Sequence, residues 1–156
     1  FGITDIRGKK ITKSIFSQIK LNIDNSVFII TEDSGVGVID SKGQYILSPK
    51  YNSIGYNKQT RTFITRIQYS ETGNYPFEGR INDVSLNGDY IVKNHVGDIV
   101  KISSNIVDWC SDFSEDGIAS VIKNGYSGHI NELNQIVSFM NDKKMEYAKS
   151  RKKQDI

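Results

Sequence analysis

The sequence predicts an all-β protein, built as an array of tandem β-hairpin or meander repeats that is either solenoid-like or propeller-like. Three observations carry this prediction. A turn-forming tetrad, Asp/Asn-x-x-Gly, recurs along the chain, and short runs of β-branched residues flank its copies. The length of 156 residues suits one domain, which can bury roughly two-thirds of the surface of the unfolded chain.

The tetrads mark four repeat units. In each turn, an Asp or Asn side chain can bond its own backbone, and glycine at the fourth position can adopt the left-handed conformation. The tetrads begin at Asp5, Asp40, Asn94 and Asn131, at steps of 35, 54 and 37 residues. In the last tetrad Asn134 replaces the glycine. The flanks repeat as well, since residues 11–19 align with residues 46–54, and residues 26–40 with residues 117–131.

Each unit is expected to form short strands joined by tight turns. The pair Asn124-Gly125 favours a two-residue hairpin because both residues tolerate positive φ. Strands are predicted at residues 27–31 and 36–39 in the second unit, 81–86, 89–92 and 98–102 in the third, and 118–122 and 127–130 in the fourth. The third unit is expected to turn at Asn87-Gly88.

Two segments depart from the repeat. An insertion at about residues 55–79 separates the second and third units, and residues 62–69 within it alternate like a strand. Residues 139–156 contain no glycine or proline, and residues 139–153 suit either one helix of about four turns or a disordered basic tail. The expected division is therefore a β-repeat domain over residues 1–138 and a basic C-terminal segment over residues 139–156.

The stretches "GVIDSKGQYILSPKYNSI" (residues 37–54) and "FSEDGIASVIKNGYSGHINELNQIV" (residues 113–137) resemble the WG (KWG) repeat of bacterial proteins. In that family a Trp-Gly pair and an apolar pair precede Asp/Asn-x-x-Gly and a Pro/Tyr-containing strand. The signature Trp is absent here, and its places hold Phe1, Val36, Tyr90 and Ser127. In the third unit Ile91 replaces the motif glycine. The resemblance implies a repeat scaffold associated with interaction rather than with one reaction.

The first unit begins inside the motif, at Phe1-Gly2. Because the open end of a repeat array exposes apolar edge surface, we expect the chain to be a piece of a longer protein or to be covered by a partner.

Composition narrows the class of protein. There are 20 basic and 18 acidic residues, and six of the basic ones lie after residue 138. Any affinity for polyanions is therefore expected in the C-terminal segment. Cys110 is the only cysteine, so the chain has no internal disulfide. No apolar run approaches the length of a membrane span, and we expect a cytoplasmic protein with no membrane partner.

Several residues are candidates for a nucleotide-binding, catalytic or metal site. Gly35-Val-Gly37 lacks the third glycine and following helix of a dinucleotide site, so it is interpreted as a hairpin turn. Cys110 would need His95 or His129 as a base, and neither lies in a catalytic signature. Asp112, Glu115 and Asp116 lack the spacing of a calcium loop. We expect no enzyme activity, metal, cofactor or small-molecule substrate.

The leading functional hypothesis is a non-enzymatic repeat module that mediates protein–protein interaction, because insertions into repeats tend to lie on the binding face. Its candidate contact residues are Arg61, Phe63, Arg66, Tyr69, Tyr75 and Phe77. Arginines among aromatic residues, Arg80 included, could also track a phosphate backbone.

The alternative hypothesis is an accessory nucleic-acid-binding subunit that acts through the basic C-terminal segment. Its candidate residues are Lys143, Lys144, Lys149, Arg151, Lys152 and Lys153.

Overall fold

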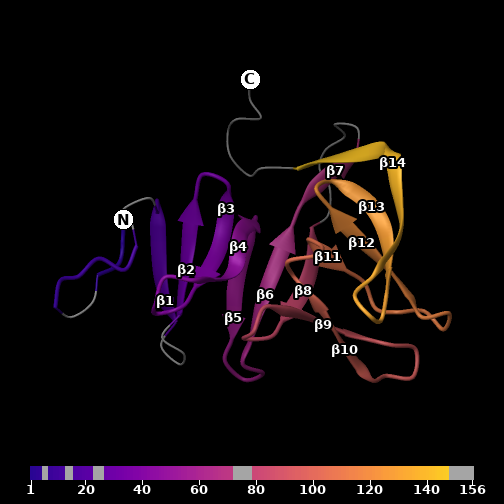
Figure 1. The fold of residues 1–156 in the computed structure, drawn as a ribbon, viewed down its shortest axis with the longest axis horizontal. Helices are drawn as coiled ribbons and strands as arrows, with labels where there is room; N and C mark the ends of the chain where they lie inside the picture. Colours follow the sequence, from indigo (N-terminus) through magenta and orange to yellow (C-terminus); the bar gives the residue numbers. More distant parts are fainter. Residues whose placement is uncertain (5–6, 13–15, 23–26, 72–78, 148–156) are drawn as a thin grey trace.

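The computed structural model describes residues 1–4, 7–12, 16–22, 27–71 and 79–147. Within these residues, the regular secondary structure is fourteen β-strands in three antiparallel sheets (Figure 1). The sheets follow one another along the longest axis of the molecule, with residues 18–51 at one end and residues 109–147 at the other (Figure 1). The all-β prediction is confirmed, and the sheets are built from repeated hairpins.

Sheet 1 has the order β1-β2-β3-β4, and its strands are β1 (Gln18–Asn22), β2 (Val27–Glu32), β3 (Gly35–Ile39) and β4 (Tyr45–Tyr51). Sheet 2 has the order β10-β9-β8-β6-β5, and its strands are β5 (Ser53–Asn57), β6 (Thr62–Ile67), β8 (Arg80–Val84), β9 (Asp89–Lys93) and β10 (Ile99–Ser103). Sheet 3 has the order β11-β12-β13-β14-β7, and its strands are β7 (Tyr69–Glu71), β11 (Trp109–Cys110), β12 (Ile118–Lys123), β13 (Tyr126–Asn131) and β14 (Ile136–Tyr147).

Three of the four predicted tetrad turns form and share one set of hydrogen bonds, whereas Asp5, which begins the first tetrad, lies outside the described residues. The side-chain Oδ1 of the first residue accepts the backbone N–H groups two and four residues ahead, at 2.9–3.2 Å. The fourth residue has a positive φ, which is 85° at Gly43, 94° at Gly97 and 63° at Asn134. Because Asn tolerates this conformation better than other non-glycine residues, Asn134 can replace the glycine. The turn-forming residues are Asp40, Asn94 and Asn131.

The turn between β8 and β9 differs from the prediction. Strand β8 ends at Val84 rather than at residue 86, since Ser85 begins a four-residue turn. The Oγ atom of Ser85 accepts the N–H groups of Asn87 and Asp89, which is the arrangement of the tetrad turns with Ser in place of Asp. The predicted Asn124-Gly125 hairpin is confirmed, because Lys123 pairs with Tyr126 across these two residues.

Single residues connect strands of neighbouring sheets on either side of β5 and β6. Only Asn52 separates β4 from β5, and only Gln68 separates β6 from β7, so the chain passes between sheets almost without a loop. The two separating residues also touch, since Gln68 N donates to Asn52 Oδ1 at 3.0 Å. The predicted strand of residues 62–69 is therefore β6, which lies inside sheet 2 and leads into the edge strand of sheet 3.

One hydrophobic core runs through all three sheets and includes the fully buried Leu47, Phe63, Tyr90 and Ile130. A second, smaller core lies at the end of the molecule and combines Ile30 and Ile39 of sheet 1 with Ile3 and Phe16. Neighbouring residues of one strand point to opposite faces. Sheet 1 is therefore buried on both faces, which explains why β2 and β3 are apolar along most of their length.

The glycine three residues before the tetrad distinguishes the repeats that have a shift in strand register from the one that does not. The register between β3 and β4 shifts on both sides of Val38, and the register between β13 and β14 also shifts twice, whereas β9 and β10 pair without a shift. The two shifted units have Gly37 and Gly128 three residues before the tetrad, where the regular unit has Ile91. A Cβ on Gly37 would lie 2.6 Å from Leu47 O, so the bulge requires glycine there.

Residues 139–147 belong to β14, so the helix that the sequence allowed over residues 139–153 does not form there. The physical reason is pairing on both sides, since residues 138–140 and 144 pair with β13 and residues 145–147 with β7. This pairing satisfies backbone groups of both partner strands. Residues 148–156 lie outside the described part of the chain.

We expect Gly37→Ala to destabilise the protein by about 2–3 kcal/mol, because the added methyl group meets the backbone of β4 and forces it to move. Gly55→Ala is the matched control, since a Cβ there has nothing within 4 Å. Urea unfolding of both variants measures the difference. Equal midpoints for Gly37→Ala and Gly55→Ala would contradict the role of the glycine.

Candidate functional site

A partly buried polar joint connects the sheets. Lys50, near the end of β4, donates from Nζ to Ser104 O at 2.6 Å and to Val107 O at 3.3 Å. The same ammonium lies 2.9 Å from Asp108 Oδ1, and the other carboxylate oxygen accepts Asn124 N at 2.9 Å. Residues 104–108 lead from sheet 2 to sheet 3, and Asn124 lies in the turn between β12 and β13. One lysine of sheet 1 therefore binds the connection between the other two sheets.

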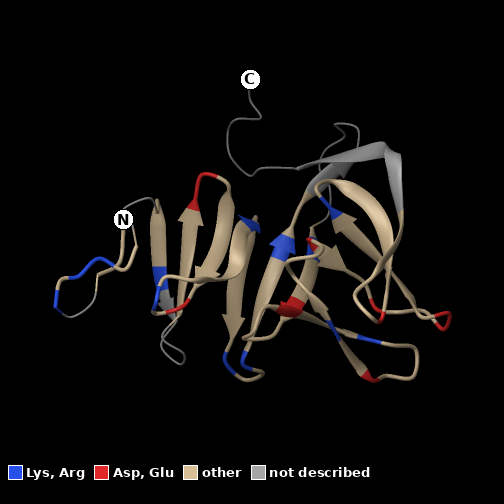
Figure 2. Cartoon of the chain, viewed as in Figure 1, with Lys and Arg blue, Asp and Glu red and all other residues tan. Residues whose placement is uncertain are grey.

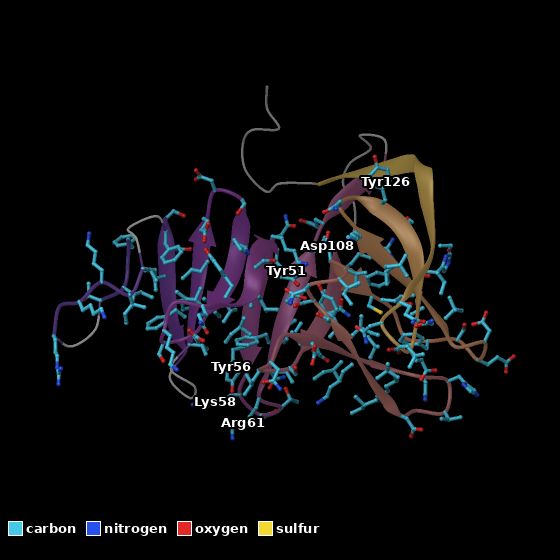
Figure 3. The ribbon with its side chains drawn as sticks, in the orientation of Figure 1. Tyr51, Tyr56, Lys58, Arg61, Asp108 and Tyr126 are labelled. Carbon is cyan, nitrogen blue, oxygen red and sulfur yellow. The ribbon has the colours of Figure 1, made fainter. Side chains whose placement is uncertain are left out.

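Two tyrosines complete the joint. The hydroxyl groups of Tyr51 and Tyr90 lie 2.7 Å apart, and Tyr90 donates to Val107 O at 2.9 Å. Burial raises the pKa of both hydroxyls well above the usual value for tyrosine, so both stay protonated. Figure 3 shows Tyr51 and Asp108 at this point in the middle of the molecule. We interpret the joint as a structural network, because its donors and acceptors are engaged with one another.

A second contact joins β8 to β11. The side chain of Asn82 donates to Cys110 O at 2.8 Å and accepts Cys110 N at 3.2 Å, as a neighbouring strand would. Trp109 Nε1 donates to Ile81 O at 3.3 Å. These three bonds occupy the edge of β8 at Ile81 and Asn82, which β9 leaves unpaired because β8 and β9 pair only at Val84 and Tyr90. The middle of the array is therefore fixed by side chains that substitute for strand pairing.

Side chains at this edge lie on opposite faces of β8. Arg66 and Ile81 are exposed on one face and form a pair that we call the β8 patch, whereas Arg80 points to the other face, towards Trp109. The guanidinium of Arg80 lies 4.9 Å from the centre of the Trp109 ring, a cation–π distance. Ile81 pairs with Arg66 across β6 and β8, and its side chain is 56% exposed. Arg66 lies over Gly79, where a Cβ would be 2.5 Å from its Nε atom. The patch thus combines an exposed aliphatic side chain with one cation, and the exposed Asp83 lies on the same face of β8.

The predicted interaction residues are divided between core and surface. Phe63 is 0% exposed and belongs to the core, so its prediction as a contact residue was wrong; the alternation of β6 turns it inward with Thr65 and Ile67. Arg66 is exposed and lies in the β8 patch. Arg61 is exposed at the tip of the β5–β6 hairpin, close to Lys58 (Figures 2 and 3).

The other predicted residues have only partial structural descriptions. Tyr69 is the first residue of β7, and its backbone pairs with Tyr147. Lys143 and Lys144 lie in β14. Outside the described residues lie Tyr75, Phe77, Lys149, Arg151, Lys152 and Lys153.

Ile81 and Trp109 were not among the predicted site residues. Ile81 lies in a predicted strand, and the alternation of β8 buries Asn82 and Val84 and exposes Ile81. Trp109 could have been singled out as the only tryptophan, since tryptophan is enriched at binding surfaces.

Cys110 and the two histidines differ in their surroundings. Cys110 is buried, and burial raises the pKa of its thiol to about 12, with the charge of Asp112 adding to the effect. His129 Nδ1 lies 2.8 Å from Ser138 Oγ, and His95 is exposed in the turn that begins at Asn94.

The acidic residues take part in backbone and turn contacts. Asp112 Oδ1 accepts Lys93 N at 3.0 Å, and a hydrogen bond from Ser114 lowers the pKa of Asp116. Among the described residues, no three His, Cys, Asp or Glu side chains gather as metal ligands would. The described residues also include no helix with the length and apolar character to cross a bilayer.

Cys110 should resist alkylation in the folded protein. The pKa rises from 9.0 to about 12, which lowers the thiolate fraction at pH 8 by about 1,000-fold. We expect iodoacetamide to react at least about 100-fold more slowly with the native chain than with the chain in urea, as measured by mass spectrometry. Native and unfolded rates within about tenfold of each other would contradict this placement of Cys110.

Comparison with known proteins identifies one repeat. Residues 37–59 match the family model described as "WG containing repeat". No curated protein and no solved structure matches the chain. The matched residues run from the bulge glycine of β3 through the Asp40 turn and β4 to the start of the insertion, and they include Lys50 and Tyr51 of the joint. The chain therefore contains a WG repeat at residues 37–59, in keeping with the family that its tetrads resemble.

Proposed function

We propose that this repeat protein is a non-enzymatic module that mediates protein–protein interaction. The observation that supports the proposal best is the β8 patch, in which Ile81 is 56% exposed beside its cross-strand partner Arg66. Arginine is enriched among the residues that dominate binding energy, particularly near a desolvated apolar centre. Burying an exposed isoleucine contributes roughly 1.5–3 kcal/mol to association.

The position of the patch favours binding further. Strand β8 pairs with β6 over five residues, and the Asn82–Cys110 bonds fix its other edge. Side chains on such a strand are already ordered before a partner arrives. Binding therefore loses less conformational entropy than it would on a loose loop.

The alternative function is an accessory nucleic-acid-binding subunit that acts through Lys143, Lys144, Lys149, Arg151, Lys152 and Lys153. It stays a prediction that rests on the charge of the C-terminal segment. Binding through phosphates should weaken steeply with salt and disappear after nuclease treatment, whereas binding through an apolar surface should persist.

The proposal predicts that Ile81→Ser weakens the capture of a protein partner by about tenfold or more, because it removes the apolar centre of the patch. Ile99→Ser is the matched control, since Ile99 is a strand isoleucine that is 61% exposed on β10. Tagged wild-type and variant chains are incubated with lysate of the native cells, with nuclease and high salt, and the bound proteins are quantified by mass spectrometry.

Proteins that bind the wild type and Ile99→Ser but not Ile81→Ser would support the proposal. Thermal unfolding of both variants checks that neither substitution alters the fold. The absence of any protein that depends on Ile81 would contradict the proposal, and binding that nuclease abolishes would favour the alternative.

A further inference from the structure

One contact between neighbouring repeats recurs along the array. A Cβ on Gly43 would lie 3.0 Å from Ile11 O, and a Cβ on Gly88 would lie 2.7 Å from Ile46 O. Both glycines end a four-residue turn that is closed by a backbone hydrogen bond. Ile11 and Ile46 each lie three residues after the glycine of their own tetrad. The turn of one repeat therefore rests on a backbone carbonyl of the repeat before it.

The fourth repeat makes the corresponding contact with a side chain. Asn134 is the last residue of its turn, and its amide donates to Lys101 O at 3.1 Å and accepts from Ser103 N at 2.8 Å. The amide supplies one donor and one acceptor, as a residue of a paired strand does. It thereby occupies the outer edge of β10. In all three cases a turn covers the strand that ends the preceding repeat.

Strand β14 has the same docking position, centred on Val137. The register between β3 and β4 leaves Ile46 unpaired, and the register between β13 and β14 leaves Val137 unpaired, three residues after the tetrad in both repeats. Ile46 is half-buried, whereas Val137 is 49% exposed. Strand β7 pairs with β14 only at residues 145–147. Within the described ranges, no turn bonds to the backbone of Val137.

The turn of residues 94–97, between β9 and β10, has the form that this position accepts. It ends at Gly97 with a φ of 94°, close to the 85° of Gly43 and the 88° of Gly88. A Cβ on Gly97 would meet nothing within 4 Å, and Val96 is 65% exposed. The tip of the β9–β10 hairpin lies at the outer edge of the molecule (Figure 1). An uncovered turn and an uncovered docking position are thus present on one chain.

The turn from Ser114 to Gly117 is closed by the same backbone hydrogen bond but is a poorer match. Its two middle residues, Glu115 and Asp116, are exposed and acidic. They would lose their water against an apolar side chain, and Glu132 lies in the turn that leads into β14. The turn of residues 94–97 presents a valine instead, which gains from burial against another valine.

We propose that a second copy of this chain places its turn of residues 94–97 on the edge of β14 at Val137. Gly97 of one copy lies against the carbonyl of Val137, as Gly88 lies against Ile46, and the exposed side chains of Val96 and Val137 become buried together. The contact joins two different surfaces, so each copy keeps one free turn and one free edge. It continues the packing between repeats from one chain to the next and does not involve the β8 patch.

Sedimentation velocity of the untagged full chain, from micromolar to near-millimolar concentration, tests this contact. Val96→Lys places a charge on the turn, and Val137→Lys places one on the edge. Ile81→Ser is the matched control, because it alters an exposed apolar residue outside the contact. Since all three positions are exposed, each variant should fold, and thermal unfolding verifies this.

We expect the mass of the wild type and of Ile81→Ser to rise with concentration above the 17.6 kDa of one chain. Each lysine variant alone should associate about tenfold or more weakly than the wild type. An equal mixture of the two lysine variants should form a dimer and stop there. The reason is that Val137→Lys keeps its turn and Val96→Lys keeps its edge, so one contact can form between them.

Three results would overturn the proposal. The wild type could sediment as a single chain at every concentration, either lysine variant could associate as the wild type does, or the mixture could stay monomeric. Association that is lost in Ile81→Ser would also overturn it, because the contact would then belong to the β8 patch. Capture of a different protein through Ile81 is measured separately, so the proposed interaction function can survive any of the first three results.

Discussion

The contact of Lys50 and Tyr51 with the segment between β10 and β11 is the constraint on which the arrangement of the three sheets depends. Strand β4 belongs to sheet 1, yet its last residues bond to Ser104, Val107 and Asp108. A partly buried ammonium is costly unless several acceptors replace its water, and here two carbonyl groups and a carboxylate do so. Because the same carboxylate accepts a bond from the turn between β12 and β13, displacing Lys50 would disturb all three sheets.

The repeats supply the elements that this joint connects. Three tetrad turns use the same pair of side-chain hydrogen bonds, and the Ser85 turn uses the equivalent pair. Neighbouring repeats then pack turn against strand. Asn134 bonds Ser103 N and Lys101 O of β10, and a Cβ on Gly88 would lie 2.7 Å from Ile46 O of β4. A degenerate repeat therefore keeps the residues that form turns and pack on its neighbour.

The sequence allowed the turns and strands to be predicted because their causes are local. Asp40 and Gly43 act within five residues, and the alternation of β6 is visible in its own six residues. The orientation of a strand is not local. The same alternation could have exposed Phe63 or Arg66, and Phe63 is buried because its face of β6 packs in the core that the three sheets share. Likewise, Asn82 and Cys110 are 28 residues apart, and only the assembled sheets bring them together at the edge that exposes Ile81 and Trp109.

Hydrogen exchange of the wild type and Lys50→Met tests most directly the claim that the joint makes the three sheets one cooperative unit. In the wild type, the amides of β2 and β3, of β6 and β8, and of β12 and β13 should open with the same free energy, as members of one unfolding unit do. In Lys50→Met, the amides of sheet 1 should lose protection first. The claim would be contradicted if sheet 1 already exchanged independently in the wild type, or if the variant kept equal protection in all three sheets.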